Sequence, residues 1–315
     1  MAEKYLMKGN EAIAEAAIRN GCIHFFGYPI TPQTEVSAYM SKVLPKIGGT
    51  FLQAESEIAA INMVLGAASC GVRAMTSSSS PGISLKSEGV SYIAGSDLPC
   101  VILNVMRGGP GLGGIQPSQA DYWQATKALG HGDFQLLVFA PATVQEIVNL
   151  IGTAFDLAEK YRMPALILAD GMLGQMMEPV EFPETVSKPA EKPYATTGTQ
   201  GKRKPNITNS LYLKPDELER TVRERFARYD VIKQNEVRCE EYLTDDADII
   251  LVAYGATARV VRSAVEDARA CGIKAGLIRP ITLWPFPEEA IRKAAARVDH
   301  MITVEMSMGQ MVEDV

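Results

Sequence analysis

The stretch "ESEIAAINMVLGAASCGVRAMTSS" (residues 55–78) predicts a helix that leads directly into a buried β-strand. Ser56 is a suitable N-cap residue, and Gly71 follows the last apolar turn of the helix. The strand predicted over 72–78 ends in a run of serines. A helix that passes at once into a strand is the repeating unit of a parallel sheet wrapped by helices.

The same alternation continues on both sides of this stretch. Further strands are predicted over 22–26, 50–54, 101–106, 136–140 and 164–170, and further helices over 12–21, 37–49 and 144–161. The segment "VILNVM" (101–106) is almost entirely apolar, as expected for a strand that is buried on both faces. The chain from about residue 11 to 175 is therefore predicted to form an α/β domain with a parallel sheet.

Two further regions follow this first domain, which we place at 1–182. Residues 183–242 are predicted to be a connector that loses the periodicity and then continues as a long charged helix over 216–242. Residues 243–315 alternate strands and helices again and predict a second, smaller α/β domain. The last residues, "GQMVEDV", read as the first turn of a helix, so we expect this domain to be truncated.

Composition and charge exclude several classes of protein. The chain has 315 residues, of which 47% are hydrophobic, and a formal net charge of -6, so nucleic acid is not an expected partner. No apolar run approaches the roughly 20 residues of a membrane span, and residues 1–21 read as an amphipathic helix, not a signal peptide. We therefore expect a cytoplasmic protein without membrane association. The five cysteines form no CxxC pair and the three histidines are scattered, so no metal site and no iron–sulfur cluster is expected on this chain alone.

Three side chains at the ends of predicted elements are candidates for chemistry. Glu57 begins the apolar face of the first quoted helix; it is either a buried acid or a partly solvated first-turn acid favoured by the helix dipole. Thr31, in the proline-braced turn "GYPITPQTE" (27–35), either meets a ligand at the carboxyl end of a strand or satisfies its own backbone. Arg107 follows "VILNVM" and is either a bidentate partner for a carboxylate or a surface arginine before a glycine-rich loop.

The three motifs "GYPITPQTE", "ESEIAAINMVLGAASCGVRAMTSSSSPG" and "VILNVMRGGPGLGG", in this order, resemble the pyrimidine-binding (alpha-type) subunit of the 2-oxoacid:ferredoxin oxidoreductases. The resemblance covers roughly residues 8–180, and the second α/β domain is more loosely similar to the transketolase C-terminal domain. It implies a parallel-sheet, thiamine-diphosphate-binding domain of the pyrimidine type over 1–182 and a transketolase C-terminal-like domain over 243–315. The chain most resembles the branched-chain (2-ketoisovalerate) members.

The resemblance also implies roles for individual residues. Glu57 matches the family glutamate that hydrogen-bonds N1′ of the cofactor aminopyrimidine and so promotes loss of the proton from C2 of the thiazolium ring. Thr31 and Arg107 match residues that face the carboxylate or carbonyl of a 2-oxoacid. The other cofactor-binding residues implied by the resemblance are Tyr28, Pro29, Ile30 and Ser79. Ser80 stands where members of the family carry a glycine, which leaves the backbone contacts there open.

Two motifs that the chain lacks imply partner subunits. There is no Gly-Asp-Gly motif with a later asparagine to hold magnesium and the diphosphate, and there is no ferredoxin-type cysteine run. The resemblance therefore implies a thiamine diphosphate site shared with a diphosphate-binding (beta-type) subunit that carries Mg²⁺. Iron–sulfur clusters would lie on that subunit or on gamma- and delta-type subunits. Such a hetero-oligomer would use coenzyme A and ferredoxin, and the chain would be inactive alone.

The side chains around Arg107 indicate the substrate. Met106 and Leu112 are apolar, and "RGGPGLGG" resembles the branched-chain members, so we expect oxidation of 3-methyl-2-oxobutanoate and similar 2-oxoacids to acyl-coenzyme A. The alternative within this class is a 2-oxoglutarate:ferredoxin oxidoreductase. The alternative of another class is a non-catalytic nucleotide-binding or structural subunit, for which "AYGATARVV" offers a single glycine after a predicted strand.

Overall fold

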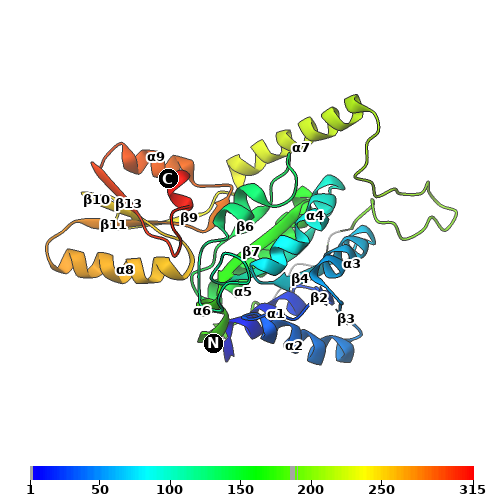
Figure 1. Cartoon of the computed structure of the whole chain (residues 1–315), viewed down its shortest axis with the longest axis horizontal. Helices are drawn as coiled ribbons and strands as arrows, with labels where there is room; N and C mark the ends of the chain where they lie inside the picture. Colours follow the sequence, from blue (N-terminus) through cyan, green and yellow to red (C-terminus); the bar gives the residue numbers. More distant parts are fainter. Residues whose placement is uncertain (1–2, 185–188, 190) are drawn as a thin grey trace.

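The computed structural model describes residues 3–184, 189 and 191–315, and two α/β units lie side by side in it (Figure 1). The larger unit is built on a seven-stranded sheet with the order β12-β6-β7-β5-β4-β2-β3. Its strands are β2 (His24–Gly27), β3 (Thr50–Gln53), β4 (Ala74–Ser78), β5 (Cys100–Met106), β6 (Leu137–Phe139), β7 (Pro164–Asp170) and β12 (Thr282–Trp284). Neighbouring strands are parallel except for β12, which is antiparallel to β6, so the predicted parallel sheet is confirmed.

Helices cover both faces of this sheet. Every residue of β5 and β7 is buried, which requires packing on both sides. Helix α1 packs against α2 and α5, while α3 packs against α4. The helices of this unit are α1 (Gly9–Arg19), α2 (Thr34–Val43), α3 (Glu57–Ser69), α4 (Pro81–Gly95), α5 (Val144–Tyr161) and α6 (Gly171–Gln175), with a 3-10 turn at Leu44–Ile47 and a π-helical turn at Gln124–Ala128. A separate two-stranded sheet pairs β1 (Lys4–Lys8) with β8 (Met177–Glu181).

The smaller unit has a four-stranded sheet with the order β13-β10-β11-β9. Its elements are β9 (Cys239–Tyr242), β10 (Ile249–Val252), α8 (Gly255–Ala270), β11 (Ala275–Pro280), α9 (Glu288–Ala295), β13 (His300–Thr303) and a 3-10 turn at Met311–Glu313. Strand β12 follows β11 directly but joins the larger sheet, so one chain segment contributes to both sheets.

Two of the predicted helices are replaced by a strand at one end in the structure. The helix predicted over 216–242 is α7 (Pro215–Asn235), and its last predicted turn is instead β9, which pairs antiparallel with β11. The N-terminal helix predicted over 1–21 begins only at Gly9, because residues 4–8 pair with β8. In both places a strand pairing with a distant segment overrides the local helical pattern. Helix α4 was not assigned from the sequence at all.

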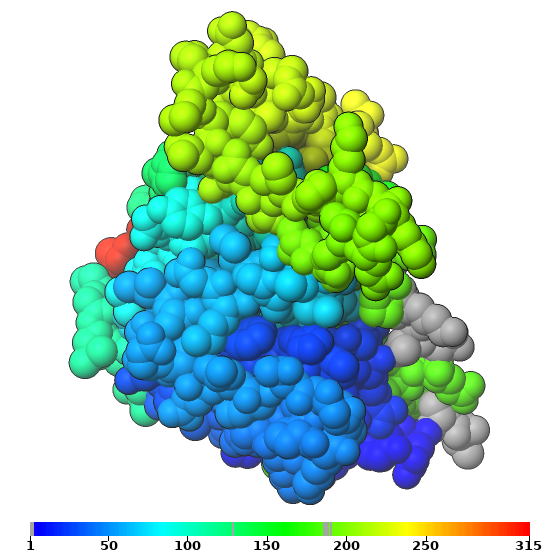
Figure 2. Space-filling model, turned by 90° about the vertical axis from the view of Figure 1, so that its right-hand side faces the viewer, coloured from blue at the N-terminus to red at the C-terminus, as the bar shows by residue number. Residues whose placement is uncertain are grey.

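Residues 191–235, the described part of the connector with α7, form an arm on the surface of the larger unit (Figure 2). Two groups of Thr196 donate to the carbonyl of Ser69 at the end of α3: the backbone nitrogen at 2.8 Å and the hydroxyl at 3.0 Å. Further on, Arg225 of α7 donates to the carbonyl of Gly95 and to Asp97 at the end of α4. The arm is therefore an ordered excursion over the surface of the larger unit.

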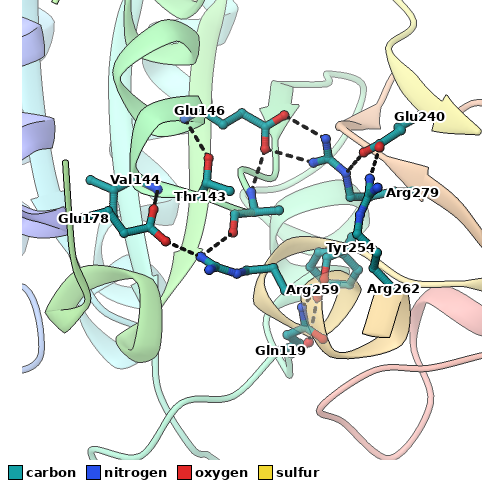
Figure 3. Close-up of polar contacts among 11 residues, drawn as sticks. Gln119, Thr143, Val144, Glu146, Glu178, Glu240, Tyr254, Arg259, Arg262 and Arg279 are labelled. Carbon is teal, nitrogen blue, oxygen red and sulfur yellow. Dashed lines mark hydrogen bonds and ion pairs between the residues drawn. The ribbon is translucent and has the colours of Figure 1, made fainter. Parts of the chain in front are cut away.

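A network of charged and polar side chains joins the two units (Figure 3). Arg279 of β11 donates to both carboxylate oxygens of Glu146 in α5, at 2.9 and 3.0 Å, and to Glu240 at 2.7 Å. Arg259 of α8 donates to Glu178 at 2.6 Å. Because Arg279 and Glu146 are mostly buried and paired bidentately, the two units are held in a fixed relation.

Within the part of the chain that the structure describes, no helix combines the length and the apolar character needed to cross a bilayer.

Candidate functional site

The predicted site residues lie at one edge of the large sheet. The turn after β2 carries Thr31, the segment after β3 leads to Glu57, the serine run follows β4 and Arg107 follows β5. These four strands are parallel, so their carboxyl ends meet at the same edge. Ligands of open α/β sheets bind at this edge.

Glu57 is the first residue of α3, and only 6% of its surface is exposed. The helix begins here because Ser56 caps it; the Ser56 hydroxyl accepts from the backbone nitrogen of Ala59 at 3.2 Å. The helix N-terminus favours the carboxylate. Glu57 is therefore a buried acid and not a partly solvated acid of the first turn. A buried carboxylate needs a partner that can donate a hydrogen bond or share a proton.

A glycine of the neighbouring helix makes room for the Glu57 carboxylate. A Cβ atom at Gly82, in the first turn of α4, would lie 2.7 Å from Oε1 of Glu57 and 2.1 Å from the hydroxyl oxygen of Ser78. Only a residue without a side chain is compatible with this arrangement. The carboxylate and the end of β4 are thus pressed against the α4 backbone.

Several hydroxyls beside Glu57 are buried without a hydrogen-bond partner among the described residues. They belong to Thr76 in the middle of β4, to Ser78 at its carboxyl end and to Ser79 just beyond it. Buried polar groups in native proteins are nearly always paired. These hydroxyls are therefore free to bind a polar ligand.

Arg107 is buried and braces two loops. Its Nη1 donates to the carbonyl of Thr31 and its Nη2 to the carbonyl of Leu112, both at 2.9 Å. Nε is buried and has no partner among the described residues. Backbone carbonyls thus take one N–H of each Nη, while Nε–H and the second N–H of each Nη are not used by these two bonds.

Ser80 holds Arg107 in place through a polar cluster that the sequence analysis missed. The Ser80 hydroxyl accepts from the Arg107 backbone nitrogen at 3.0 Å and donates to Asp121 at 2.6 Å, while Asn104 donates to Asp121 at 2.9 Å. Burial raises the pKa of Asp121, and its hydrogen bonds to Ser80 and Asn104 oppose this. The backbone of Ser80 has φ 22°, a value that favours glycine. The one sequence signal for this cluster was Asn104, a polar residue within an apolar strand.

Hydrogen bonds hold the backbone of the turn that carries Thr31, while most side chains of this turn are exposed. Asn10 donates to the carbonyl of Pro32 at 2.7 Å, and Gln175 donates to the same carbonyl at 3.2 Å. The side chains predicted to meet ligands, Tyr28, Pro29 and Thr31, are exposed, and Ile30 is half-buried. This side of the site is not enclosed by the chain itself. Among the described residues, no group of three or more His, Cys, Asp or Glu side chains could hold a metal ion.

Comparison with known proteins gives the family. Residues 15–238 match the family described as "Pyruvate flavodoxin/ferredoxin oxidoreductase, thiamine diP-bdg", and residues 247–315 match "Pyruvate:ferredoxin oxidoreductase core domain II". The chain belongs to the 2-oxoacid:ferredoxin oxidoreductase family. It is the alpha-type subunit with a thiamine-diphosphate-binding domain, as the sequence motifs predicted.

Individual members of this oxidoreductase family are similar over nearly the whole chain. "Ketoisovalerate oxidoreductase subunit VorB" of Methanothermobacter thermautotrophicus is 52% identical, with 98% of this chain and 88% of that protein covered. "2-oxoglutarate synthase subunit KorA" of the same organism is 39% identical, with 100% and 91% covered.

Two solved structures are similar in fold. The structure described as "2-oxoglutarate:ferredoxin oxidoreductase from Magnetococcus marinus with 2-oxoglutarate, coenzyme A and succinyl-CoA bound" has a TM-score of 0.91 and 30% identity. The match covers 99% of this chain but only 60% of that one. A "Split gene transketolase, inactive beta4 tetramer" has a TM-score of 0.56, 16% identity and 94% and 77% coverage, and shares the fold alone. The predicted α/β fold class is confirmed.

The contact between Gly82 and Glu57 generates the first prediction. We expect Gly82→Ala to displace the Glu57 carboxylate and to lower the free energy of unfolding by about 1–3 kcal/mol, as overpacking does. Urea unfolding of the full chain measures this change. Gly66→Ala, in α3, is the matched control: its Cβ would meet no atom within 4 Å, so it should stabilise by about 0.5–1 kcal/mol. Equal stabilities of Gly82→Ala and the unsubstituted chain would contradict the proposed confinement of Glu57.

Proposed function

We propose that this chain supplies the pyrimidine half of a thiamine diphosphate site in an enzyme that oxidises branched-chain 2-oxoacids to acyl-coenzyme A and reduces ferredoxin. The observation that carries the proposal is the buried Glu57 carboxylate, enclosed by Gly82 and by unpaired hydroxyls at the carboxyl edge of the sheet. A structural or nucleotide-binding subunit has no use for a confined acid there, because a buried charge without a partner costs stability.

Thiamine diphosphate, when bound, supplies the carbanion chemistry of decarboxylation. In this proposal Glu57 holds a proton at N1′ of the aminopyrimidine, and Ser78 and Ser79 satisfy their hydroxyls on the same ring. Arg107 offers Nε to the 2-oxoacid carboxylate, and Thr31 offers its exposed hydroxyl from the adjoining turn. Tyr28, Pro29 and Ile30 form the outer wall beside that turn. The roles of all these residues remain predictions.

A partner must complete the site. The described residues include no group of three or more His, Cys, Asp or Glu side chains that could hold Mg²⁺. We propose that a beta-type subunit binds magnesium and the diphosphate, that iron–sulfur clusters lie on that subunit or on gamma- and delta-type subunits, and that ferredoxin and coenzyme A meet the complex there. The predicted cytoplasmic location is compatible with this assembly.

This division of the site predicts that the isolated chain binds thiamine diphosphate weakly or not at all, even with magnesium. Titration calorimetry of the isolated chain and of the assembled complex, with thiamine diphosphate and Mg²⁺, measures the difference. Tight magnesium-dependent binding by the isolated chain would contradict a shared site.

The role of Glu57 predicts the outcome of Glu57→Gln in the complex. Glutamine keeps the shape and can still form a hydrogen bond, but it cannot share the proton with N1′. General acid–base groups contribute about 10²–10⁴-fold to rate, so we expect a loss of kcat in this range. Thermal unfolding of the chain should change little. Turnover close to that of the unsubstituted complex would show that Glu57 is structural.

The substrate proposal rests on Leu112 and on the relatives. Leu112 is 80% exposed in the loop that Arg107 holds, so it can meet the side chain of a bound oxoacid. Met106, which the sequence analysis paired with it, is 1% exposed and packs in the chain's own core. The similarity to the ketoisovalerate subunit is greater than that to the 2-oxoglutarate subunit, which favours a branched aliphatic substrate.

We therefore expect the complex to prefer 3-methyl-2-oxobutanoate over 2-oxoglutarate by kcat/KM, with some activity on other aliphatic 2-oxoacids. An apolar pocket separates neighbouring aliphatic substrates by only about 1–3 kcal/mol per methylene, whereas a second carboxylate without a partner is costly to bury. A panel of 2-oxoacids with coenzyme A and ferredoxin measures this preference. A clear preference for 2-oxoglutarate would support the alternative activity instead.

A further inference from the structure

A second charged side chain, Lys86, is buried next to Glu57. Lys86 is in α4, is fully buried with 0% of its surface exposed, and is among the largest fully buried side chains of the described residues. Its Nζ donates to the backbone carbonyl of Glu57 at 3.4 Å. Lysine is almost never fully buried unless it is paired, so this position calls for a physical reason.

Two residues on the face of α4 that meets α3 lie next to Glu57: a glycine that leaves space and a lysine that carries a positive charge. Gly82 and Lys86 are four residues apart and therefore lie on one face of the helix. Gly82 leaves space for the Glu57 carboxylate, and Lys86 reaches the carbonyl of the same residue. One turn further, a Cβ atom at Gly89 would lie 2.4 Å from Ile61 of α3. The two helices thus approach each other closely along the whole segment that contains Glu57.

No other charged group faces Lys86 from the elements packed around it in the described chain. Glu88, on the same helix, is exposed and accepts the hydroxyl of Tyr92. Asp170, at the end of β7, caps α6 by accepting from two backbone nitrogens. Asp121, near the start of α4, is bound by Ser80 and Asn104.

The buried ammonium does not stabilise the fold. Burial lowers the pKa of Lys86 from 10.5 to about 8, and the nearby charge of Glu57 opposes this shift. The unfolded chain therefore binds more protons than the folded chain between pH 8 and 10.5, and stability rises with pH through this window. Below pH 8 the full cost of burying the charge is present. If Lys86 only filled space, an apolar side chain of similar size would give a more stable fold.

We propose that Lys86 is a positioning residue for Glu57: its ammonium favours the ionised carboxylate and so leaves the proton shared in the site on N1′ of the aminopyrimidine. This inference rests on the proposed function. The charge acts through Glu57, and Lys86 itself touches neither substrate nor cofactor in this proposal.

The first test uses the full chain without cofactor. Lys86→Met keeps the length of the side chain and removes the charge, and Lys46→Met, at an exposed lysine, is the control. We expect Lys86→Met to raise the midpoint temperature of unfolding at pH 7 and to abolish the rise in stability between pH 8 and 10.5, with no such change in Lys46→Met. A lower midpoint temperature for Lys86→Met at pH 7 would show that Lys86 is structural and overturn the inference.

The second test uses the assembled complex and the pH profile of kcat. We expect Lys86→Met to move the acid limb to higher pH by about one unit, which corresponds to about a tenfold change in the proton equilibrium. KM for the 2-oxoacid should stay the same. Lys86→Gln keeps a donor for the Glu57 carbonyl without the charge and should behave like Lys86→Met. An unshifted profile in either variant would overturn the inference, because the charge would then not act on Glu57.

The Glu57→Gln variant distinguishes an incorrect role for Lys86 from an incorrect function for the whole site. If Glu57→Gln is inactive and Lys86→Met has the unsubstituted profile, only the role of Lys86 is overturned. If Glu57→Gln is fully active, the proposed function of the site is overturned and the role of Lys86 falls with it.

Discussion

The close approach of α4 to α3 is the constraint on which the site depends. Two glycines of α4, Gly82 and Gly89, remove the side chains that would otherwise hold the helices apart. The approach encloses Glu57 between the helices, and the Ser78 hydroxyl at the end of β4 lies against the same glycine, Gly82, as the Glu57 carboxylate. A carboxylate at a helix N-terminus is common, but a carboxylate confined by backbone on one side can meet a ligand only from the other. The geometry of the helix pair therefore leaves the Glu57 carboxylate open to a ligand from one side, which is where the pyrimidine lies in the proposed site.

The smaller unit contributes to this edge of the sheet through the segment that follows Arg107. The side chain and backbone of Gln119, in that segment, bind Tyr254, Thr257 and Met306 of the smaller unit at 2.7–3.0 Å. The Arg279–Glu146 pair fixes the relation of the two units from the other side of the contact (Figure 3). Breaking a mostly buried pair of this kind leaves an uncompensated charge, so a shift of one unit relative to the other is unfavourable. The glycine-rich loop is thus anchored at one end by the larger sheet and at the other by the smaller unit.

The parts of the site that depend on local sequence could be predicted, and the parts that depend on contacts between distant residues could not. Helix α3, its Ser56 cap and the strand after it were predictable because periodicity and capping act within a few residues. Strand β9 was taken for the end of a helix because its pairing with β11 is non-local. Gly82 could not be recognised from spacing, since its importance lies in what a Cβ would meet. Lys86 did leave a signal: with Ile83, Val90 and Ile93 it completes the apolar stripe of α4, where a charge is out of place.

The division between buried and exposed site residues agrees with a site that two subunits share. Glu57, Ser79 and Arg107 are buried by this chain alone, so their geometry exists before any partner binds. Thr31 and Leu112 are exposed, yet their backbone carbonyls are held by the two Nη atoms of Arg107. Each Nη spends one of its two N–H groups on these carbonyls, so a single guanidinium holds both loops. Nε is buried without a partner among the described residues, so a ligand that accepts from it would leave both loops where they are. Such a ligand would cost none of the hydrogen bonds that hold the glycine-rich loop, and in the proposed site Arg107 would link substrate binding to the position of that loop.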